Sequence, residues 1–151
     1  VTQWVLQPQG FPLEQAPPKQ LASHQLTLLH IYGSLFFAAA KSIEEMLPSV
    51  GHATRAVVAI NLRGKSEIGS TFVNVLQRYA QQLGRRQGKL MLVGVDPAVR
   101  DQLAKTGLLA TLGDENVFTA TPQLGEALNR AVVAANVWLA SAASDNPGIP
   151  A

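Results

Sequence analysis

Two adjacent hydroxyl side chains, Ser70 and Thr71, are the residues of this chain best placed for binding chemistry. They come after an apolar run at residues 56–62, are the last two residues of a polar loop at 61–71, and open a helical pattern. The first N–H groups of a helix lack partners within it and carry partial positive charge, which favours an anion or a phosphorylated hydroxyl. We predict that Ser70 caps this helix and that Thr71 lies in its first turn. A capped helix without any phosphate is the simpler alternative.

A second phosphate-binding pattern in the same loop fails on its spacing. Gly64-Lys65-Ser66 resembles the end of a P-loop, G-x-x-x-x-G-K-[ST], but the first glycine of that pattern would fall at Ala59, inside the apolar run. Gly69 also separates Ser66 from the helix. The sequence therefore does not predict ATP hydrolysis.

Other chemically active residue types are scattered along the chain. His24, His30 and His52 have no second ligand at metal-binding spacing, and the chain contains no cysteine. No nucleophile signature such as G-x-S-x-G is present. We expect no metal, no cofactor and no enzymatic activity.

Length and charge narrow the class of protein further. The 151 residues suffice for one domain, and a net charge of +2 without a dense basic face argues against nucleic-acid binding. No run reaches the roughly 18 apolar residues of a membrane span. The chain does not begin with Met and its opening lacks the pattern of a signal peptide, so we expect a piece of a longer protein.

Apolar periodicity predicts an alternation of strands and helices. Strands are expected at residues 26–31, 56–62, 90–95 and 116–119. Helices are expected after Ser34 with Phe36, Ala40, Ile43 and Leu47 on the apolar face, and at residues 70–86, 97–106 and 122–139, the last with Leu124 on its apolar face. The almost wholly apolar run at 56–62 is typical of an interior strand, and strands separated by helices pair in parallel. The predicted fold class is α/β.

The two ends of the chain have a different composition from the middle. Residues 1–21 contain four prolines and are expected to form an extended leader, in which Trp4-Val5-Leu6 could add an edge strand. Residues 22–140 form the predicted domain, and residues 141–151 are predicted to be a disordered tail. Trp4 and Trp138 are expected in the core, with mutual contact or a contact to a neighbouring domain as alternatives.

Two segments resemble a known family. Residues 33–40, GSLFFAAA, are similar to the opening of the STAS domain at the cytoplasmic end of SulP-type anion permeases. In anti-sigma-factor antagonists, the founding STAS proteins, a D-S-[ST]-G segment starts the helix after the central strand, and its second hydroxyl is phosphorylated. The matching segment here is Gly69-Ser70-Thr71-Phe72, and Arg78-Tyr79 also matches family usage. Gly69 replaces the Asp and Phe72 the Gly, which argues against a working phosphorylation switch.

The resemblance implies a STAS-like mixed, mainly parallel β-sheet with packed helices. It implies a cytoplasmic domain, at the inner side of the cell membrane, of a transporter for sulfate, bicarbonate or dicarboxylate. The expected role is assembly or regulation rather than ion conduction, with the transporter's own transmembrane domain, a second copy and a protein regulator as partners. Gly69, Ser70, Thr71 and Phe72 would form the phosphate- or partner-binding loop. The alternatives are a free-standing anti-sigma-factor antagonist and a nucleotide- or metabolite-sensing module with its pocket at loop 61–71.

Overall fold

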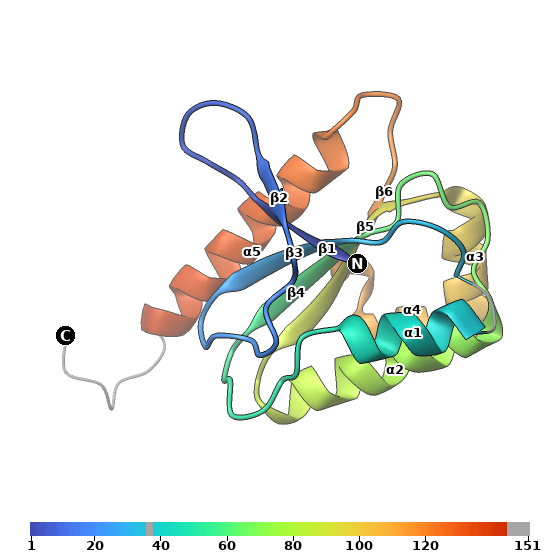
Figure 1. The fold of residues 1–151 in the computed structure, drawn as a ribbon, viewed down its shortest axis with the longest axis horizontal. Coiled ribbons are helices and arrows are strands. Elements are labelled where there is room, and N and C mark those ends of the chain that lie inside the picture. The colour runs from blue at the N-terminus through green and yellow to red at the C-terminus, as the bar shows by residue number, and fades with distance from the viewer. Residues whose placement is uncertain (36–37, 145–151) are drawn as a thin grey trace.

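The computed structural model describes residues 1–35 and 38–144, and it is built on one six-stranded sheet (Figure 1). The strands lie in the order β2-β1-β3-β4-β5-β6. Their bounds are β1 Thr2–Val5, β2 Leu13–Gln15, β3 Leu26–His30, β4 Val57–Asn61, β5 Lys89–Val95 and β6 Val117–Thr119. Strands β3 to β6 pair in parallel, whereas β1 pairs antiparallel with both β2 and β3. The predicted mixed, mainly parallel α/β fold is confirmed.

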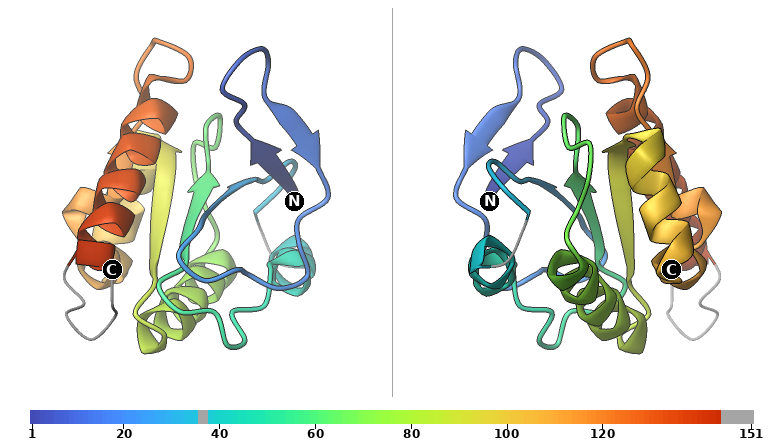
Figure 2. Two further views of the ribbon diagram at one scale, coloured as in Figure 1. Left: turned by 90° about the vertical axis from the view of Figure 1, so that its left-hand side faces the viewer. Right: turned by 90° about the vertical axis from the view of Figure 1, so that its right-hand side faces the viewer.

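Helices cover both faces of this sheet (Figure 2). They are α1 Ala38–Met46, α2 Ser70–Arg85, α3 Pro97–Lys105, α4 Leu108–Leu112 and α5 Glu126–Ser144, with a 3₁₀ turn at Asp114–Asn116. Side chains of α1 to α4 belong to the hydrophobic core on one face, and side chains of α5 belong to a second core on the other. None of the described helices is both long enough and apolar enough to cross a membrane.

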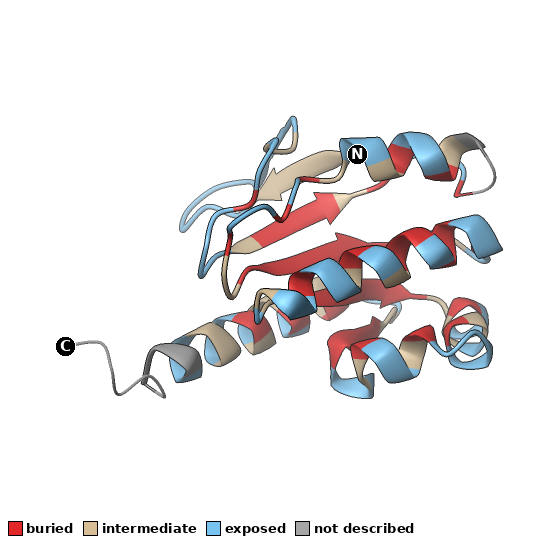
Figure 3. Cartoon of the chain, turned by 90° about the horizontal axis from the view of Figure 1, so that it is seen from below, coloured by how far each residue is buried: buried red, intermediate tan, exposed pale blue. Residues whose placement is uncertain are grey.

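The central strand is where the sequence predicts it. All five residues of β4 are buried, and the strand lies between β3 and β5. Helix α2 packs Phe72, Leu76 and Leu83 fully into the first core. The buried residues gather on the central strands and on the helix sides that face them (Figure 3). A strand covered on both faces must be apolar throughout, which is why the run at 56–62 was informative.

Residues 1–21 are more ordered than an extended leader. Strands β1 and β2 form an antiparallel hairpin that extends the parallel sheet, with Trp4 paired to Glu14 on one side and to Leu28 on the other. A strand is present where Trp4-Val5-Leu6 predicts one, but it ends at Val5 and so excludes Leu6, and its predicted place at the edge is wrong because β2 lies outside it.

The last helix begins later and ends later than its apolar pattern predicts. Gly125 has a φ of 81°, outside the helical range, and its carbonyl accepts the N–H of Asn129, so the helix starts at Glu126. Leu124 is consequently 83% exposed in the preceding turn, and its predicted place on the buried face is wrong. Residues 141–144, expected in the tail, form the last turn of α5, and residues 145–151 lie outside the described residues.

Two further differences concern short helices. Gly107, with a φ of 82°, ends α3 as predicted, but the chain then forms α4, for which the apolar pattern gives no prediction. The described part of the first helix begins at Ala38. The predicted cap at Ser34 and the position of Phe36 depend on residues 36–37, which lie outside the described residues.

Candidate functional site

The loop at residues 61–71 joins the carboxyl end of β4 to α2, as predicted. Gly69 is the N-cap residue of α2, with φ −78° and ψ 156°, and its carbonyl accepts the N–H of Val73. Ser70 is the first helical residue and makes no capping bond, so the predicted cap at Ser70 is wrong. Ser70 and Thr71 are both exposed, whereas Phe72 is fully buried. Of the four residues of the predicted binding loop, Phe72 thus serves the core.

Long-range hydrogen bonds hold this loop in place. The backbone N–H of Ile68 donates to Gln102 Oε1 at 2.9 Å, and Gln102 Nε2 donates to the Ile68 carbonyl at 3.2 Å. Lys65 Nζ donates to the carbonyl of Gly33. Because Gln102 lies on α3, the start of α2 is set by a neighbouring helix rather than by a local capping side chain.

The Arg78-Tyr79 pair, which matches family usage, joins α2 to its neighbours. Arg78 Nη2 lies 2.7 Å from Glu44 Oε2 on α1. The Tyr79 hydroxyl donates to the carbonyl of Pro48 at 2.7 Å, and burial raises the pKa of this hydroxyl above its ordinary value. Both side chains therefore position structure rather than a ligand.

A ring cluster joins the hairpin to the parallel strands. The Trp4 and His30 rings stack with centroids 4.6 Å apart, and Tyr32 meets His30 edge-on at 4.4 Å. One oxygen of Glu14, Oε2, accepts bonds from Trp4 Nε1 at 3.0 Å and from the Tyr32 hydroxyl at 2.7 Å. Tyr32 lowers the pKa of Glu14 through this bond, and burial lowers the pKa of His30. His30 Nδ1 is buried without a partner among the described residues.

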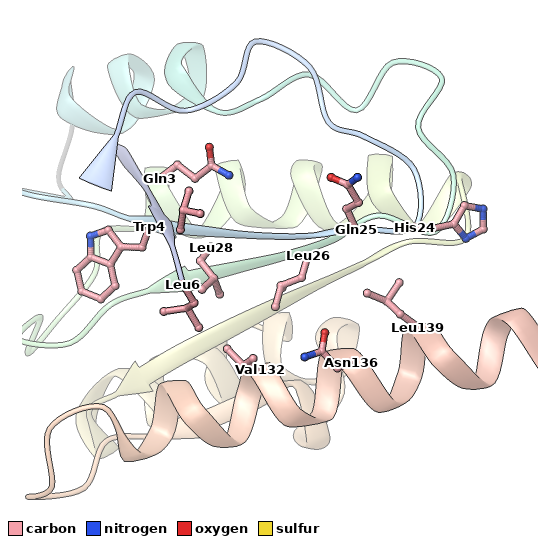
Figure 4. Close-up of a pocket in the computed structure, with 11 residues that line it drawn as sticks. Gln3, Trp4, Leu6, His24, Gln25, Leu26, Leu28, Val132, Asn136 and Leu139 are labelled. Carbon is pink, nitrogen blue, oxygen red and sulfur yellow. The ribbon is translucent and has the colours of Figure 1, made fainter. Parts of the chain in front are cut away.

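A groove of about 410 Å³ lies between the hairpin side of the sheet and α5 (Figure 4). Its apolar walls include Trp4, Leu6, Leu26, Leu28, Val132 and Leu139. The groove exists because α5 packs mainly on β5 and β6 and leaves the β1–β3 side partly open. Local sequence patterns did not reveal it, since its walls come from segments far apart in the chain.

The ring of Trp138, on α5, contacts two basic side chains. The Arg55 guanidinium lies 3.9 Å from its ring centroid and Lys89 Nζ lies 4.7 Å from it. Burial lowers the pKa of Lys89; the charge of Glu115 acts in the opposite direction, and the charge of Arg55 lowers the pKa further. Trp4 and Trp138 therefore have separate ring partners, and both pack against the core on the α5 face.

The described residues offer no cluster suited to metal binding. Within residues 1–35 and 38–144, no three His, Asp or Glu side chains lie close enough together to hold a metal ion. What the carboxyl-end loop offers chemically is a fixed helix start with two exposed hydroxyls.

Comparisons with known proteins agree with this fold. The chain is 22% identical over 141 residues to Sulfate transporter 3.2 of Arabidopsis thaliana, an alignment that covers 86% of this chain and 21% of that protein. This chain thus spans about a fifth of the length of that relative.

Two solved structures share the architecture. A sulfate transporter family protein from Wolinella succinogenes superposes with a TM-score of 0.63 at 22% identity, covering 82% of this chain and 93% of that one. The SulP transporter STAS domain of Vibrio cholerae gives a TM-score of 0.55 at 20% identity, covering 75% of this chain and 84% of that one.

The family model of the STAS domain matches residues 18–127. This match takes in the parallel strands, the loop at 61–71 and the helices α1 to α4. Because it spans most of the chain, the chain belongs to the STAS domain family.

Proposed function

We propose that this chain is the STAS domain of a SulP-type anion transporter. The observation that carries the proposal is the alignment with a sulfate transporter over 86% of the chain, which extends beyond the residues of the family match. The similar fold of a domain described as a SulP transporter STAS domain supports it. Sulfate, bicarbonate and dicarboxylates are the candidate substrates of the complete transporter.

In this proposal the domain acts on assembly or regulation of the transporter and does not conduct the ion. It lies on the cytoplasmic side of the cell membrane, attached to its own transmembrane domain, and pairs with a second copy. The exposed hydroxyls of Ser70 and Thr71, next to the free N–H groups of α2, form the regulatory contact. Gly69 shapes that contact through its backbone, and Phe72 supports it from the core.

Two experiments test the proposal. The gene should encode a series of hydrophobic spans upstream of Val1. A gene without such spans would contradict attachment to a transporter. If the spans are present, deleting residues 22–140 from the complete protein should reduce uptake of labelled anion or the amount of protein in the membrane. Unchanged uptake with unchanged abundance would remove the regulatory and assembly role.

The regulatory contact has its own test. Thr71→Glu in the complete transporter should change uptake, whereas Thr71→Ser should not, because both hydroxyl residues leave the helix start uncharged. Ser66→Glu is a matched control, since it adds the same charge at an exposed site in the same loop. Equal effects of the two Glu variants would indicate a general charge effect and not a contact at Thr71.

A further inference from the structure

A small pocket lies where loop 61–71 leaves the sheet, on the α5 face. It has a volume of about 170 Å³, and Asn61, Arg63 and Trp4 line it together with the turn before α5. Its walls are mostly apolar and include Leu124 and Leu128. The pocket is separate from the exposed hydroxyls at 70–71, because α2 covers the opposite face of the sheet.

Asn61 brings an unused hydrogen-bond donor to this pocket. The residue is 8% exposed, and its Oδ1 accepts the backbone N–H of Arg63 at 3.0 Å. Its Nδ2 group has no hydrogen-bond partner among the described residues. Because Asn61 lines the pocket, this amide is free to donate to an acceptor placed there.

Arg63 adds an uncompensated positive charge. Its Nη1 donates to the carbonyl of Thr121 at 2.9 Å, and no carboxylate of the described residues lies within ion-pair distance of it. The nearby carboxylate of Glu126 is turned to Arg130, 2.7 Å away. No acidic side chain lines the pocket.

The backbone at the start of α5 adds partial positive charge like that of Arg63, and the one acidic side chain of this turn, Glu126, is paired with Arg130. Ala127 and Leu128 line the pocket from the first turn of this helix, where backbone N–H groups lack helical partners and carry partial positive charge. An amide donor, a guanidinium and a helix start thus line one small space. Together they favour an anionic group.

Gly94 leaves the space that this arrangement needs. It lies at an irregularity in the pairing of β5 with β6 and has a φ of 68°. A Cβ atom there would lie 3.0 Å from Arg63 Cβ and 3.1 Å from Asn61 Oδ1. A larger residue would therefore displace the two polar side chains of the pocket.

Size and apolar lining narrow the ligand. A cavity of about 150 Å³ accommodates benzene, whereas drug-sized ligands occupy about 300 Å³ or more, so a nucleotide is too large. A bare inorganic anion would leave Trp4, Leu124 and Leu128 without apolar contacts. We propose that the pocket binds a small organic acid, whose carboxylate contacts Asn61 Nδ2 and Arg63 and whose apolar body contacts Trp4, Leu124 and Leu128. This site goes beyond the proposed transporter role and does not depend on it.

Benzoate is a suitable probe, and NMR of the ¹⁵N-labelled chain is the readout. Saturable shifts are expected at the Asn61 side-chain amide, the Trp4 indole and the N–H groups of Ala127 and Leu128, with the Trp138 indole unmoved. Benzyl alcohol should bind about tenfold more weakly, because it lacks the charge that Arg63 contacts. Sodium sulfate should give no saturable shift at these signals.

Variants separate the pocket from general charge effects. Arg63→Gln should weaken benzoate about tenfold without changing benzyl alcohol, and Leu124→Ala, at an exposed position, should weaken both ligands about threefold. Arg85→Gln removes the same charge at an exposed position on α2 and should change neither. The proposal is overturned if benzoate does not saturate at millimolar concentrations, if sulfate binds as well as benzoate, or if Arg85→Gln weakens benzoate as much as Arg63→Gln.

Discussion

The two faces of the sheet are covered to different extents. On one face, α1 to α4 enclose a core in which Phe72, Leu76 and Leu83 of α2 have no accessible surface. On the other, α5 is the one covering helix among the described residues, and it contacts the sheet through alanines at positions 127, 131 and 135. Small residues bring α5 close to β5 and β6 but cover little of β1 and β3, and the groove and the small pocket remain open there.

This difference separates stability from recognition. The first face is filled by large side chains, so its residues serve chiefly to hold the fold. The second face carries the groove, the small pocket lined by Asn61 and the ring cluster around His30. We therefore expect substitutions on the first face to change stability most, and substitutions on the second to change binding or pH response.

The largest expected effect is at Phe72. Phe72→Ala should lower the free energy of unfolding by about 3–5 kcal/mol, because it removes a fully buried aromatic ring from the first core. Urea denaturation followed by circular dichroism measures this, with Thr71→Ala, at the exposed neighbour, as the control that changes stability by less than about 0.5 kcal/mol. A loss below about 1 kcal/mol for Phe72→Ala would contradict the contrast between the faces.

The close contact of α5 with the sheet gives the next effect. Ala131 is fully buried in the second core, so Ala131→Leu should force α5 away from the sheet and lower the free energy of unfolding by about 1–3 kcal/mol. Val133 is 54% exposed on the same helix, and Val133→Leu should leave stability unchanged. If both variants unfold at the same denaturant concentration, the second face is not closely packed.

Most elements could be predicted from the sequence because their patterns are local. The apolar run at 56–62 and the stripe on α2 correspond to β4 and to the buried face of that helix. Asp96 and Pro97 likewise mark the start of α3, where Asp96 Oδ1 accepts the N–H of Ala98 at 2.9 Å.

The remaining features depend on contacts between distant segments. Gln102 on α3 fixes Ile68, so Gly69 rather than Ser70 becomes the cap of α2, although Ser is a preferred cap residue. The pocket joins Trp4 to Asn61, two residues on different strands that only the strand order brings together. Gly125 was a local signal for the start of α5, but Leu124 fits the helical period and concealed it.

A smaller effect is expected where charge rather than burial joins two elements of the first face. The Arg78–Glu44 pair joins α2 to α1, with side chains 52% and 40% exposed. A double-mutant cycle with Arg78→Ala and Glu44→Ala should give a coupling of about 0.2–1 kcal/mol, because water and salt screen exposed pairs. The coupling should fall further when sodium chloride is raised. A coupling as large as the effect of Phe72→Ala would show that charge, not packing, holds these helices together.

The smallest expected effect concerns pH and the ring cluster of the second face. Burial lowers the pKa of His30 below its ordinary value of 6.5; Glu14 acts in the opposite direction, while Lys65 and the amino terminus lower it further. Between the folded and unfolded pKa values, the unfolded chain binds more protons at this site than the folded chain. The stability from the neutral ring is therefore fully present above about pH 6.5 and decreases as the pH falls toward the lower folded pKa.

The loss of stability between pH 7.5 and 5.5 should be smaller in His30→Gln, which has no titrating ring, than in the unchanged chain. His52→Gln is the matched control, because His52 is exposed and belongs to the turn before β4, so this variant should keep the full pH response. Denaturation midpoints at the two pH values, measured for all three proteins, decide the matter. If His30→Gln retains the whole pH dependence, the contact of Trp4 with the neutral His30 ring does not contribute to joining the hairpin to the parallel strands. The second face would then differ from the first in its groove and its small pocket, and not in its pH response.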